Sequence, residues 1–118
     1  MSIGAISDPT LGALQFALNS LEARQKANAA NIANVETPGY LAKQVSFEDS
    51  LRSAMNSGDP TRAEVSVDQS LAPTRMNGNN VNIDFELMAQ QETLLRQRLL
   101  AQAVGNKFSL LRTAITGQ

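Results

Sequence analysis

Apolar residues recur at alternating spacings of three and four in the N-terminal part of the chain, the repeat that puts them on one side of a helix. The repeat positions are Leu11, Leu14, Leu18, Leu21, Gln25, Asn28, Ile32 and Val35. Asp8-Pro9 is a helix start signal, in which an acidic N-cap precedes proline at the first helical position. We therefore predict a long helix within residues 1–37 that ends at Thr37-Pro38-Gly39.

The C-terminal part carries the same repeat from near Asp84 almost to the end. Its positions are Leu87, Gln90, Leu94, Gln97, Ala101, Val104, Phe108, Leu111 and Ile115. A second set widens the apolar surface: Met88, Leu95, Leu99, Leu100, Ala103 and Leu110. A helix that is apolar over more than one stripe needs more than one neighbour. We predict that residues 84–118 form a helix that pairs with the first, and that the two repeats form a helix seam between subunits.

The middle of the chain, residues 38–83, contains turn formers and weaker patterns. Turn clusters stand at 56–60 and 77–80, and residues 62–67 alternate as a short strand does. Residues 46–55 suit a short helix with Ser46 as its N-cap. The predicted fold class is therefore mainly α. It has two long terminal helices in a coiled-coil-type pair, and an extended or irregular middle with a short helix and a little β.

Asparagine occupies positions 28, 31 and 34, on one arc of the first predicted helix. Asparagine is a poor helix former, so helix propensity does not explain this stripe. One interpretation is that an exposed helix surface tolerates polar residues. The other is that amides at seam positions, Gln25 and Asn28 facing Gln90 and Gln97, fix register, because a buried amide without a partner costs about 1–3 kcal/mol.

Composition excludes several kinds of chemistry. The chain has no Cys and no His, and its net charge is -1. Thiolate chemistry, disulfides, most zinc sites and the commonest general base are therefore absent, and no basic surface favours nucleic acid. We find no nucleophile or phosphate-loop motif. We expect no enzyme activity, no metal, no cofactor and no small-molecule ligand.

The first twenty residues contain no Lys or Arg and are interrupted by Asp8-Pro9, which is unlike a Sec-type signal. No segment approaches the ~18 apolar residues of a membrane span. If the protein leaves the cytoplasm, we expect it to use another route.

Residues 30–40, ANIANVETPGY, resemble the N-terminal motif of bacterial flagellar rod and hook proteins, commonly A-N-N-I-A-N-x-x-T-P-G-Y. The matching positions are Asn31, Ile32, Ala33, Asn34, Thr37, Pro38, Gly39 and Tyr40. One departure is at Ala29-Ala30, where many relatives have a further Asn. Residues 77–81, NGNNV, and the later Lys107-Phe108 with Leu111-Arg112 resemble the closing segment of one rod member of this family.

This resemblance implies a structural subunit of the flagellar basal-body rod on the periplasmic side of the inner membrane, exported by the flagellar type III apparatus. Its terminal helices would form the inner coiled-coil layer of a helical rod that transmits torque. The implied partners are further copies of itself, other rod proteins such as FlgC, and FliE with the export gate and membrane ring. The alternative function is a soluble helical adaptor or chaperone of the export pathway.

Early export substrates of this kind carry a gate-recognition pattern, Phe followed four residues later by an aliphatic residue, which the resemblance extends to Phe47 and Leu51. The other interpretation is that both side chains belong to one face of a short helix that packs on a neighbour.

Overall fold

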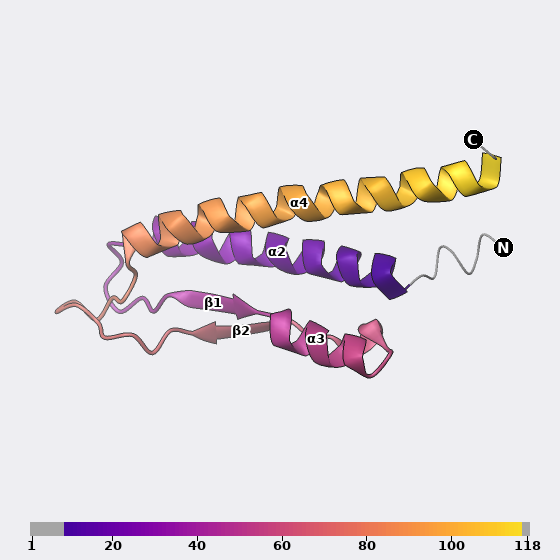
Figure 1. Ribbon diagram of the computed structural model, residues 1–118. Helices are drawn as coiled ribbons and strands as arrows, with labels where there is room; N and C mark the ends of the chain where they lie inside the picture. Colours follow the sequence, from indigo (N-terminus) through magenta and orange to yellow (C-terminus); the bar gives the residue numbers. More distant parts are fainter. Residues whose placement is uncertain (1–8, 117–118) are drawn as a thin grey trace.

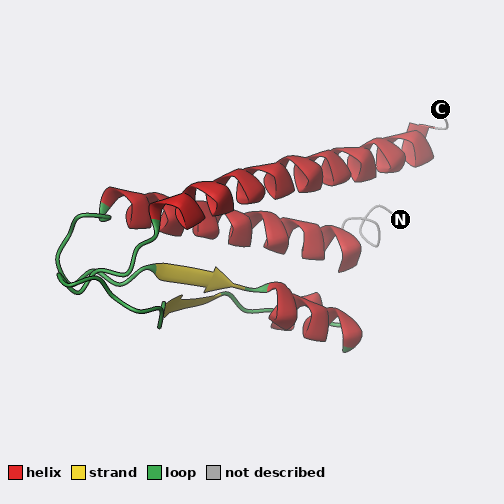
Figure 2. Ribbon diagram, turned by 60° about the vertical axis from the view of Figure 1, so that its left-hand side comes forward, coloured by secondary structure: helices red, strands yellow, loops and turns green. Residues whose placement is uncertain are grey.

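The folded molecule consists of three stacked layers of secondary structure, with the N-terminal helix in the middle (Figures 1 and 2). The computed structural model describes residues 9–116. In chain order the elements are α2 (Pro9–Ala33), β1 (Lys43–Ser46), α3 (Glu48–Asn56), the 3-10 turn η1 (Pro60–Arg62), β2 (Ser66–Gln69) and α4 (Ile83–Thr116). Helix α4 lies along one side of α2, and the β1-β2 sheet with α3 lies along the other. The molecule is elongated, 64 × 28 × 15 Å.

The predicted pair of long terminal helices is confirmed. Helix α2 begins at Pro9, and the predicted N-cap Asp8 lies outside the described residues. The helix ends at Ala33, so the predicted continuation to Val35 is wrong. The Ala30 carbonyl of the last turn accepts both the backbone N–H of Asn34, at 3.0 Å, and the Asn34 side-chain amide, at 2.8 Å.

Helix α4 begins one residue after Asn82, which supplies its N-cap. The Asn82 Oδ1 accepts a hydrogen bond from the backbone N–H of Phe85 at 3.1 Å, the usual capping arrangement. The helix then continues for 34 residues without interruption. At 1.5 Å per residue this corresponds to about 51 Å, most of the length of the molecule.

The middle segment forms an antiparallel pair of short strands, in which Lys43 is opposite Gln69 and Ser46 is opposite Ser66. The strand predicted at 62–67 is therefore misplaced, since Asp59 and Pro60 start a 3-10 turn and β2 begins only at Ser66. Strand β1 was not predicted.

The predicted short helix exists as α3, but Ser46 is not its N-cap. Ser46 belongs to β1, and Phe47 precedes the helix without a side-chain capping bond. The β-pairing of Ser46 therefore replaces the capping role that its sequence position suggested.

The apolar core is small and is built where the three layers meet. Ala17 and Leu21 of α2 are buried together with Phe47, and Phe16, Leu51 and Leu100 pack around them. The rings of Phe16 and Phe47 meet edge to face with centroids 6.2 Å apart. Because the chain has few large rings, this cluster contributes much of the apolar burial that holds the layers together.

Replacing Leu21 by Ala tests the importance of this cluster. Leu21 is fully buried, so we expect Leu21→Ala to lower the free energy of unfolding by about 2–5 kcal/mol through lost contacts and a residual cavity. Urea unfolding followed by circular dichroism measures the change. The control Leu110→Ala, at an exposed site of α4, should change it by less than about 0.5 kcal/mol. Equal effects of the two substitutions would contradict this description of the core.

Candidate assembly interface

Asparagine side chains and one carboxylate gather at the end of the molecule where the chain leaves α2 and enters α4. We call this cluster the polar junction; its members are Asn28, Asn31, Asn79, Asn80 and Glu86. All five are buried. Because buried polar groups destabilise a fold unless they are hydrogen-bonded, their partners define how the elements meet.

Asn31 is the central residue of the polar junction and has 0% exposure. Its Oδ1 accepts from the Lys43 backbone N–H at 2.8 Å, and its Nδ2 donates to the Lys43 carbonyl at 2.9 Å. The amide thus pairs with the free edge of β1 as a neighbouring strand would. Arg24 donates to the Val45 carbonyl farther along the same edge, at 2.7 Å. Side chains of α2 therefore close an edge that would otherwise be open to another strand.

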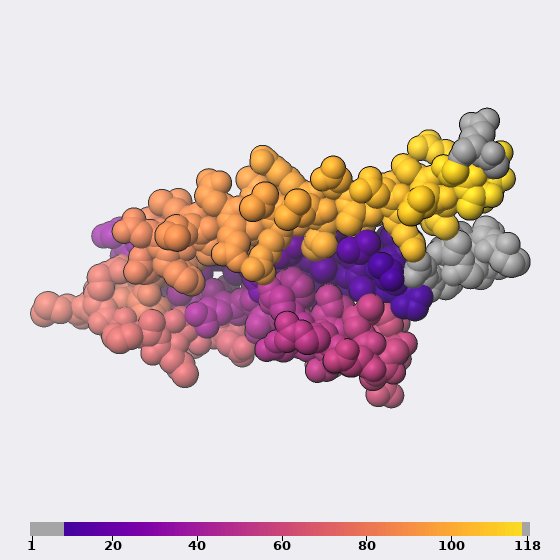
Figure 3. Space-filling model, in the orientation of Figure 1, coloured from indigo at the N-terminus to yellow at the C-terminus, as the bar shows by residue number. Residues whose placement is uncertain are grey.

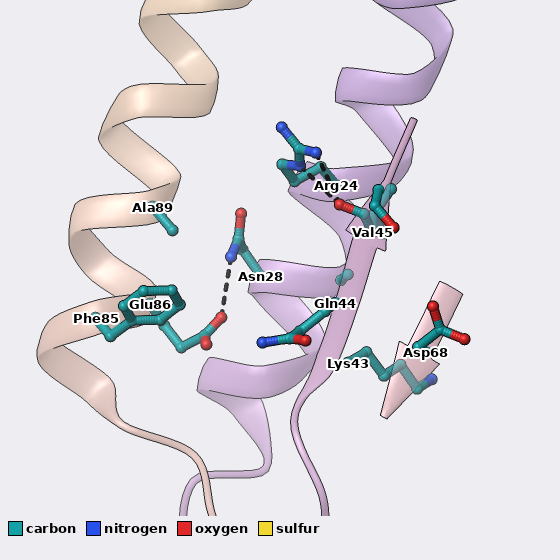
Figure 4. A pocket seen from close by; sticks show the side chains of 11 residues that line it. Arg24, Asn28, Lys43, Gln44, Val45, Asp68, Phe85, Glu86 and Ala89 are labelled. Atoms are coloured by element: carbon teal, nitrogen blue, oxygen red, sulfur yellow. Dashed lines mark hydrogen bonds between the residues drawn. The ribbon is translucent and has the colours of Figure 1, made fainter. Parts of the chain in front are cut away.

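Glu86 connects α4 to the polar junction. Its carboxylate Oε1 accepts from Asn28 Nδ2 at 2.9 Å (Figure 4). The same oxygen accepts from Asn31 Nδ2 at 2.8 Å, and the side chain is 4% exposed. Tyr40 donates its hydroxyl to Asn31 Oδ1 at 3.0 Å. Burial raises the pKa of Tyr40, and the negative charge of Glu86 raises it further. The first turn of α4 is thereby fixed against α2 in one register.

The loops that flank the helices meet through Asn79 and Asn80. Asn79 Nδ2 donates to the carbonyls of Asn34 and Thr37, at 2.8 and 2.9 Å. Asn80 Oδ1 accepts from the Ala42 N–H at 2.7 Å, and its amide donates to the Ser70 carbonyl at 3.0 Å. The two adjacent amides therefore tie the chain entering α4 to the end of α2 and to the sheet.

Gly39 and Gly78 bring the two loops into backbone contact. Their φ angles are 75° and 82°, in the region that favours glycine. Tyr40 donates its backbone N–H to the Thr37 carbonyl at 3.3 Å, which with the positive φ of Gly39 forms the type II turn expected for Pro38-Gly39. A Cβ on Gly78 would lie 3.3 Å from Gly39 Cα, so the backbones approach more closely than a side chain at position 78 normally allows.

The structure separates the two interpretations of the asparagine stripe in part. The exposed-surface interpretation is wrong for Asn28 and Asn31, which are buried and bonded to Glu86 within one chain. The oxygens Gln25 Oε1 and Asn28 Oδ1 are buried without a hydrogen-bond partner among the described residues. Register selection between subunits stays a prediction.

An ion-pair cluster joins all three layers beside the core. Glu48 accepts from Arg24 at 2.7 and 2.8 Å and from Arg96 of α4 at 3.1 Å, while the Arg24 guanidinium lies 5.0 Å from the Phe47 ring centroid. The Arg24 hydrogen bonds lower the pKa of Glu48 from 4.5 to about 2, although burial opposes the shift. Residues Phe47 and Leu51 pack in the core next to this cluster. Packing of Phe47 and Leu51 is therefore observed, and the export role stays a prediction.

The seam residues are distributed unevenly between buried and exposed positions. The buried seam residues of α2 are Leu11, Leu21 and Asn28, and the half-buried ones are Leu14, Leu18, Gln25 and Ile32. Val35, beyond the helix, is also half-buried. The half-buried seam residues of α4 are Gln90, Leu94, Gln97, Val104 and Leu111, and the exposed ones are Leu87, Ala101, Phe108 and Ile115. The buried residues of α4 are Glu86 and Thr93, one position before Leu87 and Leu94.

The offset is the same in successive heptads. Glu86, Thr93 and Leu100 follow one another at intervals of seven residues, so the face of α4 toward α2 keeps the heptad spacing but is rotated by one residue, about 100°, from the predicted face. A role of the exposed seam positions between subunits stays a prediction.

A row of large apolar side chains on α4 turns away from α2. We call it the outer stripe; it consists of Met88, Leu95, Leu99 and Leu110. Leu95 and Leu99 are 56% and 58% exposed, and Met88 and Leu110 are more exposed still. Figure 3 shows α4 as a ridge along one edge of the molecule. An exposed row of large apolar side chains is typical of a surface that packs against another protein.

The rest of the described chain has few features that suggest a catalytic or ligand-binding site. A groove of about 320 Å³ lies between α4 and β1, where Phe85, Glu86 and Ala89 face Lys43, Gln44 and Val45 (Figure 4). Its most buried charge, Glu86, already accepts two amide hydrogen bonds, and the Arg24 guanidinium is bonded to Glu48. Within residues 9–116 there is no group of three acidic metal-ligand candidates and no helix apolar enough to cross a membrane. The arrangement is suited to packing.

The sequence did not predict that Arg24, Glu48, Asn79, Asn80 and Glu86 hold the layers of one chain together. The NGNN cluster was identified as a turn, and that composition was the available signal for Asn79 and Asn80. No local pattern indicates that Glu86, in the first turn of a helix, would be buried against α2.

Comparison with known proteins agrees with this architecture. The sequence profile of the family described as "Flagella basal body rod protein" matches residues 13–40, the C-terminal four fifths of α2 and the following turn. The flagellar basal body rod protein FlgB of Bacillus subtilis (strain 168) is 28% identical, and the alignment covers 92% of this chain and 94% of that protein.

Two further relatives carry the same name. FlgB of Escherichia coli (strain K12) is 28% identical over 85% of this chain and 88% of its own length. FlgB of Salmonella typhimurium is 45% identical over a shorter region, 43% of this chain and 37% of the relative.

A long helix pair that carries an exposed apolar row is typical of a protein that packs against other proteins. Residues 13–40 of this chain match the profile of the flagellar basal body rod proteins, and over most of its length the chain is similar to FlgB.

Replacing Asn31 by Ala tests the polar junction. The substitution removes four hydrogen bonds and leaves both backbone groups of Lys43 without their partner. We expect the free energy of unfolding to fall by more than about 3 kcal/mol in a urea titration. Asn19→Ala, at an exposed position of the same helix, serves as the control and should be neutral or slightly stabilising. A small effect of Asn31→Ala would show that the junction contributes little to stability.

Acid titration tests the ion-pair cluster. Because folding lowers the pKa of Glu48 from 4.5 to about 2, its contribution is present above pH 4.5 and is lost as pH falls toward 2. We expect Glu48→Gln to flatten the loss of stability across that window, measured by urea unfolding at successive pH values. Glu22→Gln, at an exposed carboxylate, should leave the profile of the parent protein unchanged. Identical profiles for Glu48→Gln and the parent would contradict the assignment.

Proposed function

We propose that this chain is a structural subunit of the flagellar basal body rod. Copies of the chain assemble into this helical rod through the outer stripe of α4, and torque passes along the rod through the packed helices. The exposed outer stripe is the observation that supports this proposal most directly. Fully burying one Leu or Met side chain contributes about 1.5–3 kcal/mol. Covering Met88, Leu95, Leu99 and Leu110 therefore offers a stabilisation that a single chain leaves unused.

The fixed register of α4 on α2 supports the same function. Glu86 and its two amide partners hold the first turn of α4, so the outer stripe is presented at one rotation of the helix. A subunit that transmits torque has to keep its contact surface in one orientation under load. Buried, directional hydrogen bonds penalise rotation more strongly than an apolar seam, which allows side chains to repack.

The remaining parts of the proposal concern neighbours and location. We propose that the rod subunit reaches the periplasmic side of the inner membrane through the flagellar type III export apparatus, and that FlgC, FliE and the export gate with its membrane ring are its partners. The similarity to FlgB over most of the chain supports this part of the proposal. We also propose that the chain has no catalytic activity.

A soluble adaptor or chaperone of the export pathway is the alternative. Such a protein would keep its apolar surface for a client and would remain monomeric without one. The long exposed row on α4 favours self-assembly, because it extends over more than 20 residues of one straight helix, from Met88 to Leu110.

Placing a charge on the outer stripe tests the proposal. We expect Leu95→Glu and Leu99→Glu to abolish concentration-dependent association in sedimentation velocity and to prevent rod assembly, with the helical circular dichroism signal retained. Leu71→Glu is the matched control, since Leu71 is fully exposed but lies on the loop far from the stripe. Association that is unaffected by both stripe variants, or a parent protein that stays monomeric at every concentration, would contradict the proposal.

A further inference from the structure

The charges of α4 are segregated along the helix. Its acidic residues, Asp84, Glu86 and Glu92, all lie in the first third, and no Asp or Glu follows Glu92 in the sequence. Among the basic residues, Arg96 is bound to Glu92 at 2.7 Å and to Glu48 at 3.1 Å. Arg98 is exposed and has no ion pair within the described chain. The part of α4 that carries most of the outer stripe is therefore basic.

Arg98 is placed to act together with the outer stripe. It follows Leu95 by three residues and precedes Leu99 by one, so it stands at the margin of the stripe. A partner surface that covers Leu95 and Leu99 would also cover Arg98. Burying an unpaired guanidinium is costly, so that surface needs a carboxylate at the corresponding place.

The opposite layer of the molecule contains such a place. A hollow of about 360 Å³ lies between the start of α3 and the chain leading into β2, and we call it the acidic hollow; it is lined by Phe47, Glu48, Asp49, Ser50, Glu64 and Val65, among others. Asp49 is paired with Arg52 at 3.0 Å, and Glu48 with Arg24 at 2.7 Å. Glu64 is exposed and has no ion pair within the described residues.

The acidic hollow also has apolar surroundings. Val65, which lines the hollow, is 39% exposed, whereas Phe47, which also lines it, is buried; Met55, which is 39% exposed, lies outside the lining, near the other end of α3. The surface therefore has the composition that the outer stripe requires: apolar groups for Leu95 and Leu99, and an unpaired carboxylate for Arg98. Parallel packing of α4 against α4 of another copy, in register, would instead oppose basic residues, which is unfavourable.

We propose that the acidic hollow of one copy receives Arg98 of the next copy, while Leu95 and Leu99 cover Val65 and Met55. This inference rests on the proposed function, because it names the surface on which the outer stripe packs. The donor surface is on α4 and the acceptor surface is on the layer across α2. Two different patches make a heterologous contact, which repeats from copy to copy and builds a filament when the rotation does not close.

A charge swap tests the pairing. We expect Arg98→Glu and Glu64→Lys each to weaken self-association by about two- to fivefold, and the double variant to recover most of it. The measurement is sedimentation velocity at low ionic strength. Arg112→Glu is the matched control, because it makes the same change on the same helix about 20 Å away and should have no effect on the Glu64→Lys background. Additive weakening in the double variant would overturn the pairing.

Cross-linking tests the geometry without relying on charge. The chain has no cysteine, so Gln102→Cys on α4 and Ser66→Cys beside the hollow can be placed on separate copies and mixed under oxidising conditions. We expect the mixed disulfide dimer to exceed both homodimers. If the parent protein associates but homodimers dominate, this inference fails and the proposed function stands. If the parent protein does not associate at all, both fail.

Discussion

A buried carboxylate that accepts two amide hydrogen bonds controls how this chain is organised. Glu86 meets Asn28 and Asn31 inside the molecule, and each of these groups would destabilise the fold if its partners were removed. The arrangement is satisfied in one register only, because a shift of α4 by one residue moves the carboxylate around the helix by about 100°. The apolar contacts between the long helices are less directional and therefore less selective. Directional bonds at one end therefore orient a surface that runs the length of the molecule.

The fold follows from the sequence to the extent that its information is local. Apolar periodicity predicts both long helices, and the proline-glycine pair predicts the turn with positive φ at Gly39. Strand β1 was missed because its edge partner is a side chain, Asn31, which lies on α2 and pairs with Lys43. The strand predicted at 62–67 was displaced because Asp59 and Pro60 favour a 3-10 turn before it. Pairing across the chain decides these two elements.

The sequence predicted that α4 has a second apolar surface, but it did not predict which face of α4 meets α2 or the role of Glu86. The excess of apolar residues on α4 indicates a second neighbour, and the outer stripe carries that excess at Leu95 and Leu99. Which face of α4 meets α2 could not be read from apolar periodicity, because two of its buried positions are the polar residues Glu86 and Thr93. The role of Glu86 was equally inaccessible, because an acidic residue in a first turn is ordinarily explained by the helix dipole.

The close approach of Gly39 and Gly78 separates the middle of the chain from its ends. Where the loops at Gly39 and Gly78 cross, the two backbone segments meet with no side chain between them. The carbonyl of Asn77 accepts the N–H of Gly39 there at 2.9 Å. The segment from β1 to β2 therefore leaves the helix pair and returns to it at this one crossing. The crossing depends little on the length of that segment, since the free energy of loop closure depends only weakly on loop length. The segment from β1 to β2 can thus lengthen, shorten or acquire a new surface without a change in the helix pair.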